Sequence, residues 1–362
     1  MTGRNGREAL FTGTLSAAVI GYALLILGLS GARVGEALVL LAAYLRIAGA
    51  LWVFVALAAL LVLLRRTSAD AAGGSLVRLA GRALHDRWRR DGCVSLLAPP
   101  LLFALLVASF NLFKQTVLPR FGFGADAGLA ALDRMLFGGV DPWRVTHALL
   151  PSPWATFLID KAYHGWFAPM TLGFILCAFL PATADHLRIR YLVSFVAVWI
   201  LLGSGLAILL PAAGPCFQPA TIGTVPGFEP LLSHLHAQQH WLAARLPGTS
   251  LAALTFQRGL LDLHDGGGAL MVGGGISAMP SIHNALAALF AMAAFRLNRT
   301  AGRVMSAYAV LIWVGSIHLG WHYAVDGLVA VALTYAIWLG AGRYADRLLA
   351  ADPARTGRLA VA

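Results

Sequence analysis

Long apolar segments restrict the folds open to this chain more than any other feature of its sequence. Apolar residues make up 59% of the 362 positions and charged residues only 12%. The apolar residues fall in blocks of about 18 or more, which is the length that an α-helix needs to cross a bilayer. We therefore expect an all-α, polytopic membrane helix bundle whose surroundings are the lipid bilayer.

Charged residues, Pro and Gly divide the chain into about eight predicted transmembrane helices. Lys and Arg outnumber Asp and Glu by 27 to 16, and most of the basic residues fall on the side that also holds both termini. Because basic loops favour the cytoplasmic side, we expect cytoplasmic termini in a multi-pass protein of the cell (inner) membrane. The spans are predicted near residues 9–30, 36–64, 93–112, 154–181, 190–210, 281–297, 304–322 and 324–342.

Composition also predicts three regions. Residues 1–92 form a membrane hairpin with a basic interfacial segment, 93–345 a catalytic membrane domain, and 346–362 a cytoplasmic tail. The arginines from Arg78 to Arg90 alternate with apolar residues, as in amphipathic helices that rest on anionic headgroups. No basic stretch belongs to a soluble region large enough to dock a duplex, so we expect no nucleic-acid partner. The long connection 211–278 is predicted to fold over a site as a lid.

Two short stretches near the C-terminus carry most of the chemical information, and the first is Met-Pro-Ser-Ile-His-Asn at 279–284. Ser281 is a preferred helix N-cap, and the free N–H groups of a helix N-terminus can also hold a phosphate. Ser281 therefore caps the helix, binds phosphate, or does both. His283 lies in the first turn of that helix, within reach to donate a proton to the leaving oxygen of an anion bound there.

The second stretch, residues 315–326, places His318, His322 and Asp326 four residues apart. On a continuous helix these three side chains would share one face. We hypothesise that Asp326 accepts a hydrogen bond from one ring nitrogen of His322 and leaves the other free to attack phosphorus. The predicted topology puts both stretches on the outer side, so the active site is expected to be extracytoplasmic.

These residues resemble a known family. Pro280-Ser281-Ile282-His283 is similar to the P-S-x-H motif, and His322-x-x-x-Asp326 to the H-x-x-x-D motif, of the type 2 phosphatidic acid phosphatase superfamily. The M-P-S-x-H-N beginning, the H-Y-x-x-D form and an upstream Ala213-Gly214-Pro215 loop resemble its inositol phosphorylceramide synthase-like branch of inositolphosphotransferases.

The resemblance implies both a fold and a mechanism. The fold is a six-helix phosphatase-like core. His322 would be the nucleophile that becomes a phosphohistidine, His283 the general acid and Asp326 the residue that orients the nucleophile. The protein would then be a hydrolase or transferase of lipid metabolism that acts on a membrane lipid phosphate.

Two departures from the family pattern affect phosphate binding. The K-x6-R-P motif is represented only by Lys114-x5-Arg120 with no following Pro, and Lys114 and Arg120 are predicted as phosphate ligands on that basis. The phosphatase branch has an Arg at the position of Ser316, so a bidentate phosphate clamp is missing here. His318 is predicted to supply part of the lost charge. The missing Arg is compatible with a phosphotransferase.

Two other functions compete with this hypothesis. The imidazoles and carboxylate of the two stretches suit zinc in an intramembrane hydrolase, although the Pro-Ser before His283 has no role in such a site. A non-catalytic lipid transporter would leave both motifs without a use. We expect no metal and no cofactor, and the donor lipid, the acceptor and the oligomeric state stay open. The remaining polar residues are predicted to be interfacial, structural or headgroup-binding: Asp133, Arg134, Asp141, Trp143, Asp160, Lys161, His164, Arg245 and Arg258.

Overall fold

A computed structural model describes residues 3–64, 97–178, 180, 184–221, 228–266 and 269–350. Regular structure in these ranges is helical and includes no strand, which confirms the all-α prediction. The basic segment from Arg78 to Arg90 and the tail beyond residue 350 lie outside them. The elements are α1 (Gly3–Ser30), α2 (Val34–Leu64), η2 (Leu118–Phe121), α4 (Asp126–Leu136), α5 (Pro142–Leu149), α6 (Pro153–His164), α7 (Phe167–Ala178), α8 (Asp185–Ala197), η4 (Val198–Leu206), α9 (Ala207–Leu209), α10 (Gln218–Thr221), α11 (Glu229–Arg245), α12 (Ala252–Gly266), α13 (Ile282–Leu297), α14 (Arg299–His318) and α15 (Ala324–Ala350).

Six helical segments in the described ranges are long and apolar enough to cross a membrane: Gly6–Ser30, Val34–Phe54, Leu97–Phe121, Asp185–Leu209, Arg299–His318 and Ala324–Ala350. A polytopic helix bundle is therefore confirmed, whereas the count of eight is not. The predicted span 281–297 is α13, which has only 16 residues. The predicted span 154–181 is broken after His164 into α6 and α7. At the break the Trp166 N–H donates to the Tyr163 carbonyl, three residues back, at 3.2 Å, so the four-residue pattern of an α-helix is interrupted.

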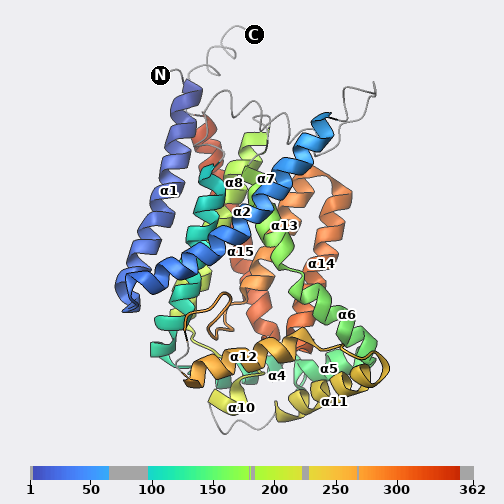
Figure 1. The fold of residues 1–362 in the computed structure, drawn as a ribbon. Helices are drawn as coiled ribbons and strands as arrows, with labels where there is room; N and C mark the ends of the chain where they lie inside the picture. The colour runs from blue at the N-terminus through green and yellow to red at the C-terminus, as the bar shows by residue number, and fades with distance from the viewer. Residues whose placement is uncertain are drawn as a thin grey trace.

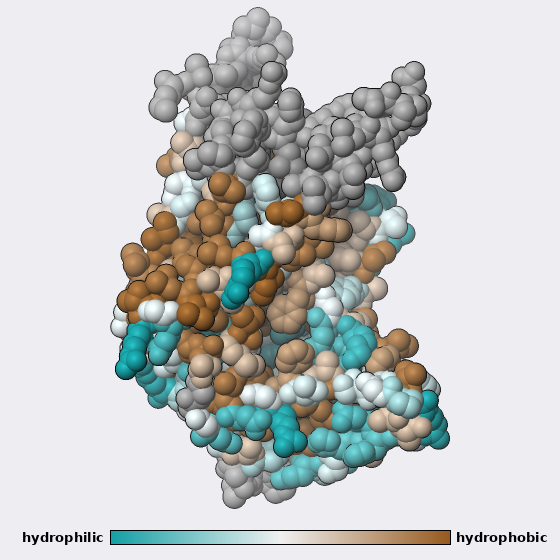
Figure 2. All heavy atoms as spheres, viewed as in Figure 1, coloured by the Kyte–Doolittle hydropathy of each residue, from teal (hydrophilic) through white to brown (hydrophobic). Residues whose placement is uncertain are grey.

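A layer of short helices covers one end of the bundle. α4, α5, α11 and α12 lie there, while α1 begins and α15 ends at the opposite end (Figure 1). Hydrophilic residues gather over the covered end, and hydrophobic residues dominate the surface of the long helices (Figure 2). The described parts of the predicted lid 211–278 contain α10, α11 and α12. Its helix α12 is fixed to α6 because Asp160 accepts the N–H groups of Ala252 and Ala253 at 2.9 and 2.8 Å.

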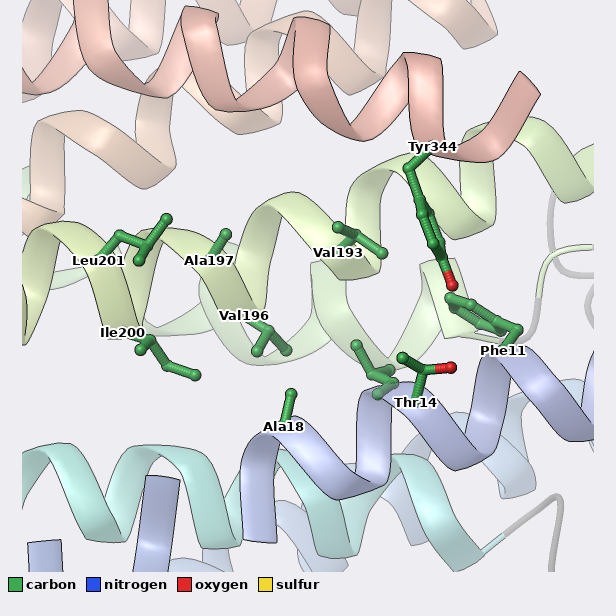
Figure 3. A pocket seen from close by; sticks show the side chains of 10 residues that line it. Phe11, Thr14, Ala18, Val193, Val196, Ala197, Ile200, Leu201 and Tyr344 are labelled. Atoms are coloured by element: carbon green, nitrogen blue, oxygen red, sulfur yellow. The ribbon is translucent and has the colours of Figure 1, made fainter. Parts of the chain in front are cut away.

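The N-terminal hairpin packs more loosely than the other helices. Only 22% of the α1 span and 17% of the α2 span are buried, against 67% for Leu97–Phe121. A groove of about 290 Å³ separates α1 from α8 and ends at Tyr344 of α15 (Figure 3). Its walls are apolar, formed by residues such as Phe11, Ala18 and Ile200. The hairpin therefore presents apolar surface outward, as a helix pair that faces lipid does.

Candidate active site

The N-terminus of α13 forms the first part of the site. Ser281 is the N-cap and is fully buried, and its Oγ accepts from the backbone N–H of Asn284 at 3.4 Å and from its Nδ2 at 2.9 Å. The Asn284 Nδ2 also reaches Oγ of Ser316 on α14 at 3.3 Å. The predicted cap is therefore confirmed, and the cap ties the start of α13 to the last turn of α14.

His283 lies in the first turn of α13 and is held between aromatic rings. Its ring stacks on Tyr163 at a centroid distance of 4.8 Å and lies 4.2 Å from Trp166, both from the α6–α7 region. The Lys114 ammonium and the imidazoles of His164 and His322 lie close enough to interact electrostatically with it. The two aromatic contacts restrict the orientation of the ring, which is what a general acid needs. Sequence reasoning did not single out Tyr163 or Trp166.

His322 lies in a tight turn between α14 and α15. Two glycines with positive φ shape this region. Gly320, within the turn, has φ +77°, and Gly214, in a loop that packs directly against the turn, has φ +101°. A Cβ on Gly214 would lie 2.6 Å from the Trp321 carbonyl oxygen. The Cys216 N–H donates to the Gly320 carbonyl at 2.8 Å. The Ala-Gly-Pro loop noted in the sequence is thus the backbone support of the His322 turn.

His322 and Asp326 form a buried pair. His322 is 6% exposed and Asp326 fully buried, with 3.4 Å between the His322 Nδ1 and the Asp326 Oδ2. The Asp326 Oδ2 accepts a hydrogen bond from the backbone N–H of Tyr323 at 3.0 Å. The backbone N–H of His322 donates to the Ser316 carbonyl at 3.1 Å. Within the described part of the chain, the His322 Nδ1 and the Asp326 Oδ1 form no hydrogen bond. The two atoms are in contact but do not meet the geometry of a hydrogen bond, and catalytic hydrogen bonds are often poorly aligned without substrate.

The imidazoles of His283 and His322 lie opposite each other without touching. The ring centroids of His283 and His322 lie 6.2 Å apart, with 54° between the ring planes. The structure therefore brings together the P-S-x-H and H-x-x-x-D motifs at one end of the bundle.

Asp133 of α4 holds the first turn of α15. Its Oδ2 accepts the Ala324 N–H at 2.7 Å and its Oδ1 the Val325 N–H at 2.9 Å. Burial raises the pKa of Asp133 to about 6, with the charges of Asp326 and Asp141 adding to the effect and the two N–H groups opposing it. The sequence predicted only an interfacial helix here and did not predict the contact between Asp133 and α15.

Asp126 begins the same helix and supports the other side of the turn. It accepts the N–H groups of Ala213 and Gly214 at 2.7 and 2.9 Å and the Tyr323 hydroxyl at 2.7 Å. Burial raises its pKa, against the effect of these donors. Sequence reasoning missed Asp126. The spacing could have identified it, because Asp126 and Asp133 are seven residues apart and so share one face of an amphipathic helix.

His318 does not join the His322 site, contrary to the continuous helix on which that prediction depends. α14 ends at His318, whose side chain lies against α5 and α6, and the chain then turns before His322. Its Nε2 lies 2.8 Å from Thr156 Oγ1, its Nδ1 lies 3.3 Å from Thr146 Oγ1, and its ring stacks on His147 at 3.7 Å. The zinc ligand set considered from the sequence is not assembled, because His318 has these other partners.

The two predicted cationic phosphate ligands separate in the structure. Arg120 donates to the carbonyls of Leu29 and Ser30 at 2.8 and 2.7 Å and so caps the C-terminus of α1, a favourable place for a cation. Lys114 interacts with His283 and lies 6.0 Å from the Phe110 ring centroid. Of the two, only Lys114 is positioned at the site.

The other polar residues of the end layer make structural contacts. Asp141 pairs with Arg134 at 2.6 Å and occupies the N-cap position of α5. Asp160 binds Lys161 at 3.1 Å as well as α12, and Arg245 stacks on Trp241 at 3.7 Å.

Together, the fold and the site define a membrane-embedded helical protein with an oriented histidine–aspartate pair opposite a second histidine. The sequence profile of the PAP2 superfamily matches residues 127–340, more than half of the chain, so the protein belongs to the PAP2 superfamily. The match contains both motifs, as well as Asp133, and ends within α15. Membership indicates a phosphoesterase of the phosphatase type. No curated protein and no solved structure matches the chain.

Proposed function

We propose that this protein is an integral-membrane lipid phosphatase or phosphotransferase that cleaves a lipid phosphoester through a phosphohistidine on His322. The observation that carries the proposal is the buried His322–Asp326 pair, 3.4 Å apart, with His283 opposite at 6.2 Å. One imidazole oriented by a carboxylate suits a nucleophile, and a second imidazole across a gap suits an acid.

The reaction takes place in two steps. In the first, the Nε2 lone pair of His322 attacks phosphorus, an N–P bond forms, and the P–O bond to the leaving group breaks as His283 donates its proton to the departing oxygen. Asp326 stabilises the positive charge that develops on the His322 ring. In the second, a water or an alcohol gives its proton back to His283 and attacks phosphorus, and the N–P bond breaks. Water gives hydrolysis, and an alcohol gives transfer.

Phosphate binding is supported by the N-terminus of α13 and by Lys114. The backbone N–H groups of the first helical turn and the positive end of the helix dipole favour an anion beside Ser281. Lys114 adds a cation whose field already reaches His283. Arg120 and His318 bind other partners and are not needed in this assignment.

The site is proposed to face the extracytoplasmic side of the cell membrane. The end of the bundle opposite the site carries Arg188, Arg190 and Arg347 near the start of α8 and the end of α15. Basic residues favour the cytoplasmic side. Substrate would therefore come from the outer leaflet, and both termini would be inside.

Transfer to a hydroxyl acceptor is the favoured form of the second step. The helices of the segment 211–278 cover the site, and the Gln257 side chain of α12 binds the Leu319 carbonyl beside the His322 turn at 2.8 Å. Such a cover limits the access of water to the phosphoenzyme. The resemblance of the motifs to the inositol phosphorylceramide synthase-like branch agrees with this choice.

A product analysis tests the proposal. Purified protein is incubated with a panel of labelled lipid phosphates and phosphodiesters, with and without alcohol acceptors and with a metal chelator present throughout, and the products are identified. We expect cleavage of at least one lipid by the wild type, loss of that cleavage in His322→Ala, and a transfer product when an alcohol is supplied. Equal turnover by wild type and His322→Ala would overturn the proposal, and loss of all turnover with the chelator would favour the zinc hydrolase.

A further inference from the structure

The helix α4 carries two buried carboxylates that the proposed mechanism does not use. Asp126 is fully buried and Asp133 is 3% exposed, and they lie seven residues apart on one face of the helix. Burying a carboxylate is costly unless hydrogen bonds satisfy it. Both are satisfied here mainly by backbone N–H groups, those of Ala213 and Gly214 for Asp126 and those of Ala324 and Val325 for Asp133.

Asp133 determines where α15 begins. Its two oxygens accept the first two N–H groups of the helix, those of Ala324 and Val325. The next residue along the chain is Asp326, and the Tyr323 N–H, on the other side, donates to Asp326. The backbone between His322 and Asp326 is therefore fixed at three consecutive N–H groups, two of them by α4. A Ser or Thr at the N-cap would satisfy such donors locally, whereas a carboxylate from another helix also fixes where that turn lies.

Asp126 acts on the same turn from its other side. It binds the Tyr323 hydroxyl directly. It also holds Ala213 and Gly214, whose loop supports the turn through the hydrogen bond from Cys216 to Gly320. Through these contacts, α4 reaches the chain both before and after His322.

We propose that Asp133, supported by Asp126, is a positioning residue for the nucleophile: it fixes the first turn of α15 and thereby the alignment of the His322 ring with Asp326. This inference rests on the proposed function, because it assigns the two carboxylates to the reaction of His322.

The protonation of Asp133 gives the proposal a signature in pH. The charged carboxylate accepts two N–H groups, whereas the neutral acid carries a proton on one oxygen and loses one of these bonds. Burial places the pKa of Asp133 at about 6, and the groups that face it are Asp326 from α15, Asp141 from the turn before α5, and the two N–H donors. Below that pH, the wild type therefore behaves like a variant with an amide at this position.

The test compares Asp133→Asn with the wild type on a lipid phosphate that the protein cleaves, for example dioctanoyl phosphatidic acid with release of phosphate as the readout. At about pH 7.5 we expect kcat to fall about 10- to 100-fold with KM nearly unchanged, because a small misplacement of a reacting group costs this much. We also expect the ratio of wild-type to variant kcat to approach one as the pH is lowered through about 6. The matched control is Asp262→Asn, the same substitution at an exposed position of α12, which leaves both constants unchanged.

A second measurement is independent of turnover. The His322 ring signals in the NMR spectrum of protein labelled at histidine are assigned by their loss in His322→Gln. We expect Asp133→Asn to move the titration midpoint of this ring, and Asp262→Asn to leave it in place. If Asp133→Asn does not fold, Asp126→Asn is measured in the same way, with the same direction of change expected for kcat and for the midpoint.

The two proposals fail in different ways. Turnover that survives His322→Ala overturns the proposed function, and the NMR midpoint then decides the role of Asp133 by itself. Turnover that needs His322 but keeps its wild-type kcat in Asp133→Asn overturns the positioning role. A loss in Asp133→Asn that is the same at every pH, with an unmoved His322 midpoint, also overturns it, since that pattern describes a structural residue.

Discussion

Two pairs of histidines lie at the same end of the bundle, and they differ in how their ring nitrogens are engaged. In the first pair, His283 and His322 face one another at 6.2 Å, and the His322 Nδ1 faces only Asp326. In the second, His318 is bound through both ring nitrogens to Thr146 and Thr156. Its partner His147 donates from Nε2 to the His318 carbonyl at 2.9 Å.

The difference between the pairs separates the proposed reactive site from a structural one. His318 and His322 are four residues apart, yet the turn at Gly320 sends them to different surroundings. A histidine whose nitrogens are satisfied by hydroxyls and carbonyls contributes to packing, whereas one with a carboxylate partner and a free nitrogen can react. The contacts of the ring nitrogens therefore say more about the role of a histidine than the number of histidines in a motif does.

The largest effect is expected at the nucleophile. His322→Ala removes the group proposed to attack phosphorus, so kcat should fall by about 10⁴-fold or more. Rates of lipid phosphate cleavage by purified wild type and variant, with a circular dichroism melt as the folding control, measure this. A variant that retains a tenth of the wild-type rate would place the nucleophile elsewhere.

The carboxylate that orients the nucleophile comes next. In Asp326→Asn the His322 nucleophile remains but loses its orienting charge, so kcat should fall by about 10³-fold while substrate binding persists. Steady-state kinetics together with a direct binding assay separate the two constants. Loss of binding with unchanged kcat would make Asp326 a substrate ligand instead.

The general acid should show a dependence on the leaving group. His283→Gln should slow cleavage of a lipid phosphate by about 100-fold, because the alkoxide must then leave without a proton. An aryl phosphate ester has a leaving group that needs no proton, so its cleavage should be slowed much less. Equal losses on the two substrates would contradict this assignment of His283.

A smaller effect on activity is expected in the second histidine pair. His318→Gln loses hydrogen bonds and ring stacking, so the free energy of unfolding should fall by about 1–3 kcal/mol. The activity of the folded fraction should stay within about threefold of the wild type, since the side chain contacts Thr146 and Thr156 away from the reacting groups. Thermal unfolding and specific activity of the same preparation test both parts, and an activity loss like that of His322→Ala would return His318 to the phosphate site.

The last prediction concerns stability and not activity, and it is a pH dependence that belongs to His147. Burial lowers its pKa to about 4 from 6.5, with a contribution from nearby His234 and against the hydrogen bond to the His318 carbonyl. The unfolded chain therefore binds a proton that the folded one does not, and stability is lost as the pH falls from about 6.5 toward 4, by at most roughly 3 kcal/mol. Unfolding midpoints measured across this range should fall less in His147→Gln than in the wild type, and parallel curves would show that His147 titrates normally.

The sequence predicted those parts of the molecule that depend on local pattern. Apolar blocks predicted the helical bundle, and Ser281 before a helical stretch predicted its N-cap, because both signals need only a few neighbouring residues. The motifs predicted that His283, His322 and Asp326 meet. The structure places them together, and their roles stay proposals.

The parts that could not be predicted depend on contacts between distant segments. The break after His164 is a local turn between α6 and α7, and α6 is also attached to the distant α12 through Asp160. The turn at Gly320 separates His318 from His322, although their spacing is that of a continuous helix. Arg120 is assigned to phosphate by an imperfect match to the family motif but binds the end of α1 instead. The contacts of Asp126 and Asp133 span 87 or more residues of chain.

The most direct test of the account is to trap the phosphorylated enzyme. The wild type is mixed with a lipid phosphate labelled with ³²P, quenched in alkali within the first turnover, and digested for mass spectrometry. The account predicts a base-stable, acid-labile phosphoryl group on the peptide that contains His322, absent from His322→Ala and from a sample quenched in acid. Label on the peptide of His318 or on a Ser, or full turnover with no labelled peptide under these conditions, would contradict it.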